Sequence, residues 1–293
     1  MDKFDQRKMD KFNQGYVNSF AIGQGYGDTF VRVPMASHNN DIRIVILGKT
    51  GTGKSATGNS ILDKKEFECS PGGSISTWSC LKRETKRFEK NVVVIDTPGL
   101  QEVKKPMHAI RSEIQKSIEM AYPISGIAHP GPNVFLLCLK MGRFTAEDET
   151  LFQECLIIFG EEMLPFTIVV FTHEDTWESD MEYSGRDPKH SEYMQSLPLF
   201  ALEFIGKCRS HICFNNRKTG LDMDLQVQLL FKQIEDAIVL NSGNVYTNEI
   251  LQKVVSREQF KNNISYWYTN GKKMLNSVLA VGNVFLFWRN FKR

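Results

Sequence analysis

The chain has 293 residues, 41% hydrophobic and 24% charged, which are the proportions of an ordinary soluble globular protein. This length allows one large domain, or one domain with appendages, around a sizeable buried core. The net charge of +2 is too small to indicate nucleic-acid binding by bulk electrostatics.

The six cysteines show no framework spacing, and the polar N-terminus lacks the apolar core of a secretory signal. We therefore expect free thiols in a reducing, cytoplasmic compartment. One short stretch, with Cys208, His211 and Cys213, holds residue types that bind metals. No second ligand pair follows it at zinc-site spacing, which argues against a metal there.

Residues 1–40 are rich in Asn, Gln and Gly and lack helical or strand periodicity, which predicts a mobile leader. Beyond them, apolar runs predict buried strands at 42–47, 91–95, 134–139, 166–171 and, more weakly, 210–214. Helices are expected at 54–62, 107–121, 145–160, 191–208 and 222–241. The alternation predicts an α/β fold, a doubly wound and mostly parallel sheet with flanking helices, which binds ligands at the carboxyl ends of its strands.

Residues 48–55 read GKTGTGKS and match G-x-x-x-x-G-K-[ST], between a predicted strand and a predicted helix. The glycines let backbone N–H groups converge on phosphate oxygens, and the helix N-terminus adds partial positive charge. Lys54 would neutralise the β- and γ-phosphates, and Ser55 would offer its hydroxyl to Mg²⁺. The nucleotide-binding residues predicted here are Gly48, Lys49, Thr50, Gly51, Thr52, Gly53, Lys54, Ser55 and Ala56.

A D-T-P-G motif with Asp96 and Gly99 follows the next apolar strand. Asp96 is placed to hold the water shell of Mg²⁺, and the N–H of Gly99 to meet the γ-phosphate. Alone, the motif could be a simple turn. One strand after a P-loop, it indicates a second part of the phosphate site.

The nucleotide base has to be identified separately, and T-H-E-D after the strand 166–171 offers candidates. The carboxylate of Asp175 can accept the N1 and N2 hydrogens of guanine, whereas adenine would leave it unpaired. His173 is expected against the base plane, with Glu174 beside it. Asn215, after the last strand, could support the base edge or the Asp175 loop. We therefore predict a site for GTP or GDP with Mg²⁺.

These motifs together resemble the GTPases of immunity-associated proteins, the GIMAP family, within the septin-like P-loop GTPases. Four stretches carry the resemblance: residues 48–62, 96–100, 130–148 and 171–175. The third is the most specific, because it joins P-G-P, an apolar strand and G-R-F-T-x-E-D. Three departures stand out: Asn133 replaces a usual His, Asp63 replaces a usual Gly, and the base motif is one residue shorter.

The resemblance implies a G domain, which we place at 41–242, between the leader at 1–40 and a helical extension at 243–293. It also implies dimers or oligomers that form through the nucleotide face when GTP is bound, among copies of this chain or with family relatives. Many members of the family sit on the cytosolic face of internal membranes. The family is associated with lymphocyte survival and immune regulation.

The resemblance also bears on catalysis. Thr77 matches the switch threonine that closes on Mg²⁺ in the family. In Ras-type GTPases a Gln after D-x-x-G positions the attacking water, and here Leu100 occupies that place. Gln101, one position later, is a candidate substitute. We therefore expect slow intrinsic hydrolysis.

Arg143 matches a family arginine that can reach a partner's phosphates in a dimer, and an arginine supplied in this way can raise the rate about 10³–10⁵-fold. The alternative is a structural arginine that pairs with Glu147 or Asp148. Two functions therefore stay open: a slow GTPase activated by assembly, and a nucleotide-locked scaffold with negligible hydrolysis. A P-loop kinase of a small metabolite is disfavoured by the guanine motif.

The C-terminal segment 274–288 carries no charge, and 270–293 holds five basic residues and no acidic one. At about 1.5 Å per residue, fifteen helical residues are short for a hydrocarbon core about 30 Å thick. Basic flanks favour an anionic leaflet. Membrane contact through 270–293 is the leading interpretation; packing on the G domain or on a partner, and a disordered tail, are the alternatives.

Overall fold

The computed structural model describes residues 41–69, 78–100, 106–121, 131–247 and 249–253. The predicted leader, Thr77, Gln101 and the apolar segment 274–288 lie outside these ranges, so their predicted roles stay predictions. Among the described residues, no helix has both the length and the apolar character needed to cross a bilayer.

Six strands form one sheet in the order β2-β3-β1-β4-β5-β6. Their bounds are β1 Asp41–Gly48, β2 Leu81–Arg87, β3 Lys90–Asp96, β4 Val134–Lys140, β5 Thr167–Thr172 and β6 Ser210–Phe214. β2 pairs with β3 in the antiparallel sense, and the other neighbours are parallel. The five predicted strands and the predicted α/β class are confirmed. β2 was not predicted, because its sequence LKRETKR has no apolar run.

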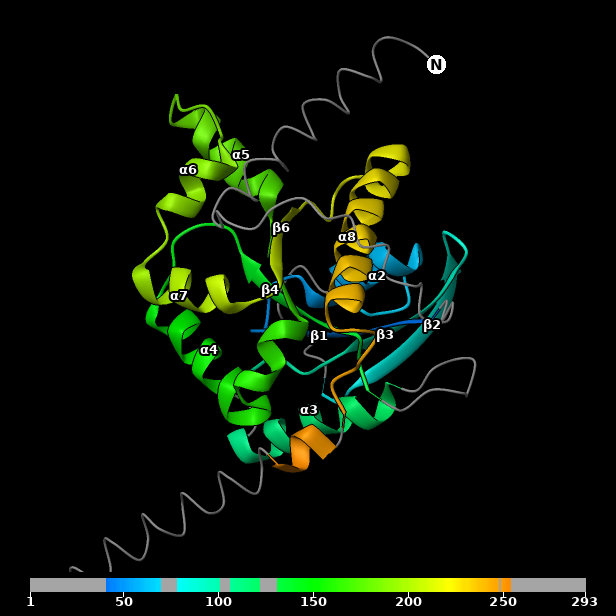
Figure 1. Cartoon of the computed structure of the whole chain (residues 1–293). Coiled ribbons are helices and arrows are strands. Elements are labelled where there is room, and N and C mark those ends of the chain that lie inside the picture. Colours follow the sequence, from blue (N-terminus) through cyan, green and yellow to red (C-terminus); the bar gives the residue numbers. More distant parts are fainter. Residues whose placement is uncertain (1–40, 70–77, 101–105, 122–130, 248, 254–293) are drawn as a thin grey trace, which may run out of the picture.

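Helices cover both faces of this sheet (Figure 1). α2 (Lys54–Leu62) and α8 (Gly220–Leu240) pack on one face, and α3 (Met107–Met120), α4 (Ala146–Phe159) and α7 (Leu199–Lys207) on the other. Side chains of β1 alternate between the two cores: Ile44 and Ile46 face α2 and α8, and Val45 faces the opposite layer. The remaining elements are η2 (Glu161–Phe166), α5 (Glu174–Tyr183) and α6 (His190–Gln195).

The helix predictions are confirmed at α2, α3, α4 and α8 and need correction elsewhere. The helix predicted at 191–208 is two helices, α6 and α7, because Pro198 stands at the N-cap of α7 and cannot continue a preceding helix. α5 was not predicted. It begins directly after β5, where His173 adopts a left-handed backbone with φ 60°.

Two of the departures from the family pattern have local explanations. Asp63 ends α2 with φ 55°, a left-handed conformation that glycine adopts most easily. Asn133 is buried, and its Oδ1 accepts hydrogen bonds from the backbone N (2.9 Å) and Nε (3.2 Å) of Arg43. Asn133 therefore satisfies a buried arginine of β1.

The loops that follow β1 and β3 touch each other. The N–H of Leu100 donates to the carbonyl of Gly48 at 3.1 Å, and Lys49 and Leu100 form an isolated parallel bridge. A Cβ on Gly99 would lie 2.6 Å from the backbone N of Thr50, closer than real Cβ contacts. The approach fixes the D-T-P-G loop against the P-loop and requires glycine at 99.

The core continues past the predicted domain boundary at 242. Val245, Tyr246 and Leu251 are buried, and the last two lie in the layer of α3 and α4. Tyr246 donates its hydroxyl to the carbonyl of Phe159 at 2.6 Å, and its ring meets Phe135 edge-on at 5.2 Å. We therefore propose that the G domain extends at least to residue 253.

Replacing Tyr246 tests this extension. We expect Tyr246→Ala to lower the free energy of unfolding by about 3–5 kcal/mol, the usual cost of truncating a buried aromatic side chain. Tyr246→Phe should cost only about 1–3 kcal/mol, because it leaves one carbonyl unsatisfied. Urea unfolding of the full chain measures both. Leu240→Ala, at a position 64% exposed, is the matched control and should stay within about 0.5 kcal/mol of wild type.

Replacing Gly99 tests the contact between the two loops. Gly99→Ala should destabilise the protein by about 1–3 kcal/mol, because the P-loop or the D-T-P-G loop must move to admit the methyl group. Gly206→Ala is the control, since this helical position is open and alanine favours helix by up to about 1 kcal/mol. Equal thermal midpoints for the two variants would contradict the close approach.

Candidate functional site

The segment between β1 and α2 has the backbone of a phosphate-binding loop. Gly51 and Gly53 have φ of 82° and 79°, left-handed values that direct N–H groups toward a common point. Lys54 begins α2, and its ammonium donates to the carbonyl of Lys49 at 2.8 Å, across the loop. Thr52 is tied to the sheet, because the hydroxyl of Thr172 on β5 donates a hydrogen bond to its carbonyl at 2.8 Å.

Ser55 and Asp96 meet where the ends of β1 and β3 converge. The Ser55 hydroxyl donates to Oδ2 of Asp96 at 2.6 Å, although the two residues are 41 positions apart in sequence. Asp96 is fully buried. A hydroxyl and a carboxylate side by side at the N-terminus of α2 are hard oxygen donors, which fit Mg²⁺. Ala56 follows in the first turn of this helix.

The candidate base residues lie after β5. His173 is half-buried; burial and the charge of Lys140 lower its pKa, so the ring is neutral at pH 7. Its Cε1 lies 3.5 Å from where a Cβ on Gly53 would stand, which brings it beside the P-loop. The carboxylate of Asp175 forms an ion pair at 3.0 Å with Arg217, whose side chain is 83% exposed.

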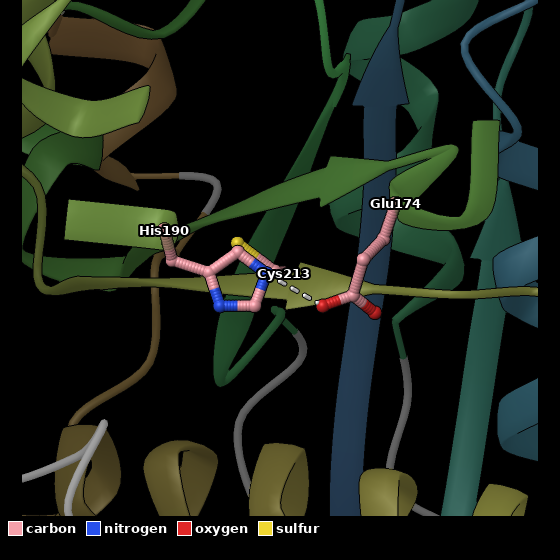
Figure 2. A group of neighbouring side chains, drawn as sticks. All are labelled: Glu174, His190 and Cys213. Carbon is pink, nitrogen blue, oxygen red and sulfur yellow. Dashed lines mark ion pairs between the residues drawn. The ribbon is translucent and has the colours of Figure 1, made fainter. Parts of the chain in front are cut away.

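Glu174 has different neighbours from Asp175. Its buried carboxylate lies 2.9 Å from Nε2 of His190 (Figure 2). The ammonium of Lys218 lies 3.6 Å from the same carboxylate. Burial alone would raise the pKa of Glu174, but these two partners lower it. Hydrogen bonds with Cys213 and Glu174 raise the pKa of His190 to about 10. These bonds hold the predicted base contact Glu174 among α6 and β6, so its local role is to join these elements.

The two asparagines after β6, Asn215 and Asn216, contact different parts of the site. Asn215 accepts the N–H of Arg217 at 2.8 Å through Oδ1, and its own N–H donates to Gln226 of α8. It therefore shapes the loop that brings Arg217 to Asp175. Asn216, which the sequence did not single out, donates to Thr57 of α2 at 3.1 Å and lies beside Gly53.

Arg143 lies near the P-loop. A cavity of about 780 Å³ lies there between Thr50–Thr52, the end of β4 and the N-terminal part of α5, and Arg143 is one of its lining residues. Arg143 is exposed and forms no ion pair with another described residue. The acids proposed as its alternative partners, Glu147 and Asp148, bind Lys49 of the P-loop instead, at 3.5 Å and 2.6 Å.

Asp148 has a second role that sequence reasoning missed. Thr145 is the N-cap of α4, and its N–H donates to Asp148 at 2.8 Å, which completes a capping box. The T-x-x-D spacing before the apolar run of α4 is the signal that could have revealed it. No comparable sequence pattern indicated Arg217, because its role depends on the loop between β6 and α8.

Comparison with known proteins gives a consistent result. The AIG1 family profile matches residues 42–264. The chain is 31% identical over 224 residues to immune-associated nucleotide-binding protein 9 of Arabidopsis thaliana, covering 75% of this chain and 62% of that protein. It is 30% identical over 207 residues to human GTPase IMAP family member 8, covering 70% of this chain and 28% of that protein.

A solved structure of the chloroplast translocon components atToc33 and psToc159 has the same fold, with a TM-score of 0.50 and 20% identity over 68% of this chain and 83% of that one. The chain matches less than two thirds of the length of the two relatives named above, the Arabidopsis protein and the human GTPase IMAP protein. The matched family segment includes the P-loop, the D-T-P-G loop, the base loop and the buried Tyr246. The chain therefore belongs to the AIG1 family, to which its likeness to the GTPase IMAP proteins pointed.

Proposed function

We propose that this protein binds GTP and GDP with Mg²⁺ at the P-loop. The main support for the proposal is the hydrogen bond from Ser55 to Asp96. It joins the two predicted Mg²⁺ residues, one in the first turn of α2 and the other at the carboxyl end of β3. Ser55 and Asp96 would hold the cation, directly or through water, and Lys54 would bind phosphate oxygens. When bound, Mg²⁺ supplies positive charge that offsets the phosphate charge. Predicted contacts of Gly99 and Thr77 complete this site.

Base selection is assigned to Asp175, with His173 beside the base. A carboxylate accepts both guanine donors and would be left unsatisfied by adenine. Arg217 forms an ion pair with the same carboxylate, and a guanine base that binds there must replace part of this interaction. Because an exposed ion pair is worth only about 0–1 kcal/mol, this exchange is inexpensive.

For hydrolysis, we propose a slow GTPase activated by dimerisation through the nucleotide face. Leu100 is fully buried and cannot orient water. Arg143 is exposed beside the P-loop cavity, where a partner molecule could be reached. Dimerization is important for the GTPase activity of atToc33 and psToc159, which share the fold. Assembly on a cytosolic membrane surface, partnership with family relatives and an immune role complete the proposal.

The second candidate function is a scaffold that holds nucleotide without significant hydrolysis. The burial of Leu100 favours it, because Leu100 stands where Ras-type GTPases have the water-positioning Gln. The two candidates differ in turnover and agree on nucleotide binding.

Asp175→Asn tests the base assignment. The amide replaces one acceptor oxygen by a donor that faces a donor of guanine, so GTP affinity should fall roughly 100-fold, given about 1.5–3 kcal/mol per charge-assisted hydrogen bond. Xanthosine triphosphate, which carries a carbonyl in place of the 2-amino group, should gain affinity. Competition against a fluorescent GTP analogue measures both. Glu182→Gln, an exposed change on the same helix, should bind GTP as wild type does; an unchanged GTP affinity in Asp175→Asn would refute the assignment.

Specific activity against protein concentration tests activation by assembly. GTP turnover per molecule of full chain should rise with concentration, and ATP turnover should be negligible. Arg143→Ala should abolish the rise, a loss of up to about 10³-fold, while leaving GTP affinity intact. Arg186→Ala, an exposed change after α5, is the control. Turnover that stays near zero at every concentration, with GTP tightly bound, would support the scaffold and reject activation by assembly.

A further inference from the structure

Behind the base loop, three side chains from three elements converge away from the predicted Mg²⁺ residues. Glu174 begins α5, His190 begins α6 and Cys213 lies on β6. One potential ligand atom from each residue lies within 4.8 Å of the other two. Figure 2 shows a ring nitrogen of His190 directed toward the carboxylate of Glu174, with the thiol of Cys213 drawn next to the same ring. The stretch with Cys208 and His211 contributes only Cys213 to this cluster.

We propose that Glu174, His190 and Cys213 form a second cation site, selective for Zn²⁺, with water as the fourth ligand. Carboxylate, imidazole and thiolate are zinc ligands, whereas Mg²⁺ prefers the all-oxygen donors Ser55 and Asp96. Atoms bound to one tetrahedral Zn²⁺ lie roughly 3–4 Å apart, given bond lengths of about 2.0–2.3 Å. Shifts of about 1 Å would therefore bring the three ligands into place.

The surroundings of the cluster suit a metal. The indole of Trp177 stacks on the ring of His190, with centroids 5.8 Å apart and planes 24° apart, which fixes the ring orientation. Lys218 lies 3.6 Å from Oε2 of Glu174, while His190 is nearest Oε1. One carboxylate oxygen can thus bind the cation while the other keeps an outer partner, an arrangement that orients metal ligands in proteins.

Charge is conserved when the cation binds. Without metal, the cluster holds a carboxylate, an imidazolium and a thiol, and its net charge is zero. On binding, the proton between His190 and Glu174 and the thiol proton of Cys213 leave to solvent, and bonds from nitrogen, sulfur and oxygen to Zn²⁺ form. The metal-bound cluster is again neutral, so the dication adds no net charge to this partly buried site.

The site would join α5, α6 and β6. Because Glu174 directly precedes Asp175, a cation here would anchor the start of the helix that carries the proposed guanine acceptor. Metal binding itself does not depend on the proposed nucleotide function, so the two can fail separately.

The test uses the full chain, stripped with a chelator and titrated with Co²⁺, which reports a thiolate ligand by a charge-transfer band. We expect a band that saturates at one equivalent, disappears on adding Zn²⁺ and survives excess Mg²⁺. Zn²⁺ should also raise the thermal midpoint. Cys213→Ser and His190→Gln should weaken Zn²⁺ binding more than about 100-fold, since losing even an outer partner costs roughly 10–100-fold.

Cys69→Ser is the matched control, because Cys69 is an exposed thiol away from the cluster; it should keep the band. Cys213→Ser is nearly isosteric, and its thermal midpoint without metal shows whether it folds. Absence of the band in wild type, or its loss in Cys69→Ser with retention in Cys213→Ser, would overturn the site. GTP affinity measured on the same samples keeps this result separate from nucleotide binding.

Discussion

The contact between the loops after β1 and β3 is the constraint on which the phosphate site depends. Leu100 donates to the carbonyl of Gly48, and Gly99 approaches Thr50 so closely that a side chain has no room. A parallel sheet brings the carboxyl ends of neighbouring strands to one edge, but only to the spacing of strands, about 4.8 Å. The loop contact closes the remaining distance and lets Ser55 and Asp96 form a hydrogen bond. It also explains why Leu100 is buried: its backbone is needed by the P-loop, so its side chain points into the core.

A second set of contacts ties the P-loop to α4. Asp148 accepts from Thr145 at the N-cap of that helix and pairs with Lys49 at 2.6 Å. Asp148 therefore links the N-terminus of α4 to the P-loop. Within the G-R-F-T-x-E-D segment, Thr145 and Asp148 therefore have a structural role, whereas Arg143 is exposed. Glu147 and Asp148, the acids that would pair with a structural Arg143, bind Lys49 in this geometry, which supports the proposed role of Arg143 toward a partner.

Most of the fold could be predicted from the sequence because the parallel strands are buried on both faces and read as continuous apolar runs. The same reasoning could not find β2, an edge strand whose side chains are largely charged, or α5, whose sequence EDTWESDMEY is polar and short. Pro198 itself indicates a break between α6 and α7, so the prediction of one continuous helix at 191–208 was wrong. Tyr246 was assigned to an appendage because the chain beyond α8 loses its α/β pattern. Its burial depends on packing against Phe135 and Phe159, which lie far away in sequence.

The candidate site, too, could be predicted from the sequence only in part. The conformation of the P-loop glycines and the proximity of Ser55 and Asp96 could be predicted from the motifs, whereas the side-chain partners of the acids on α5 could not. Glu174 and Asp175 are adjacent acids, yet one is buried against His190 and Lys218 and the other faces Arg217 at the surface. Successive helical residues point about 100° apart, so neighbouring carboxylates on α5 necessarily meet different surroundings. α5 begins immediately after His173, so Glu174 faces His190 and Lys218, and Asp175 is left at the edge where the base is proposed to bind.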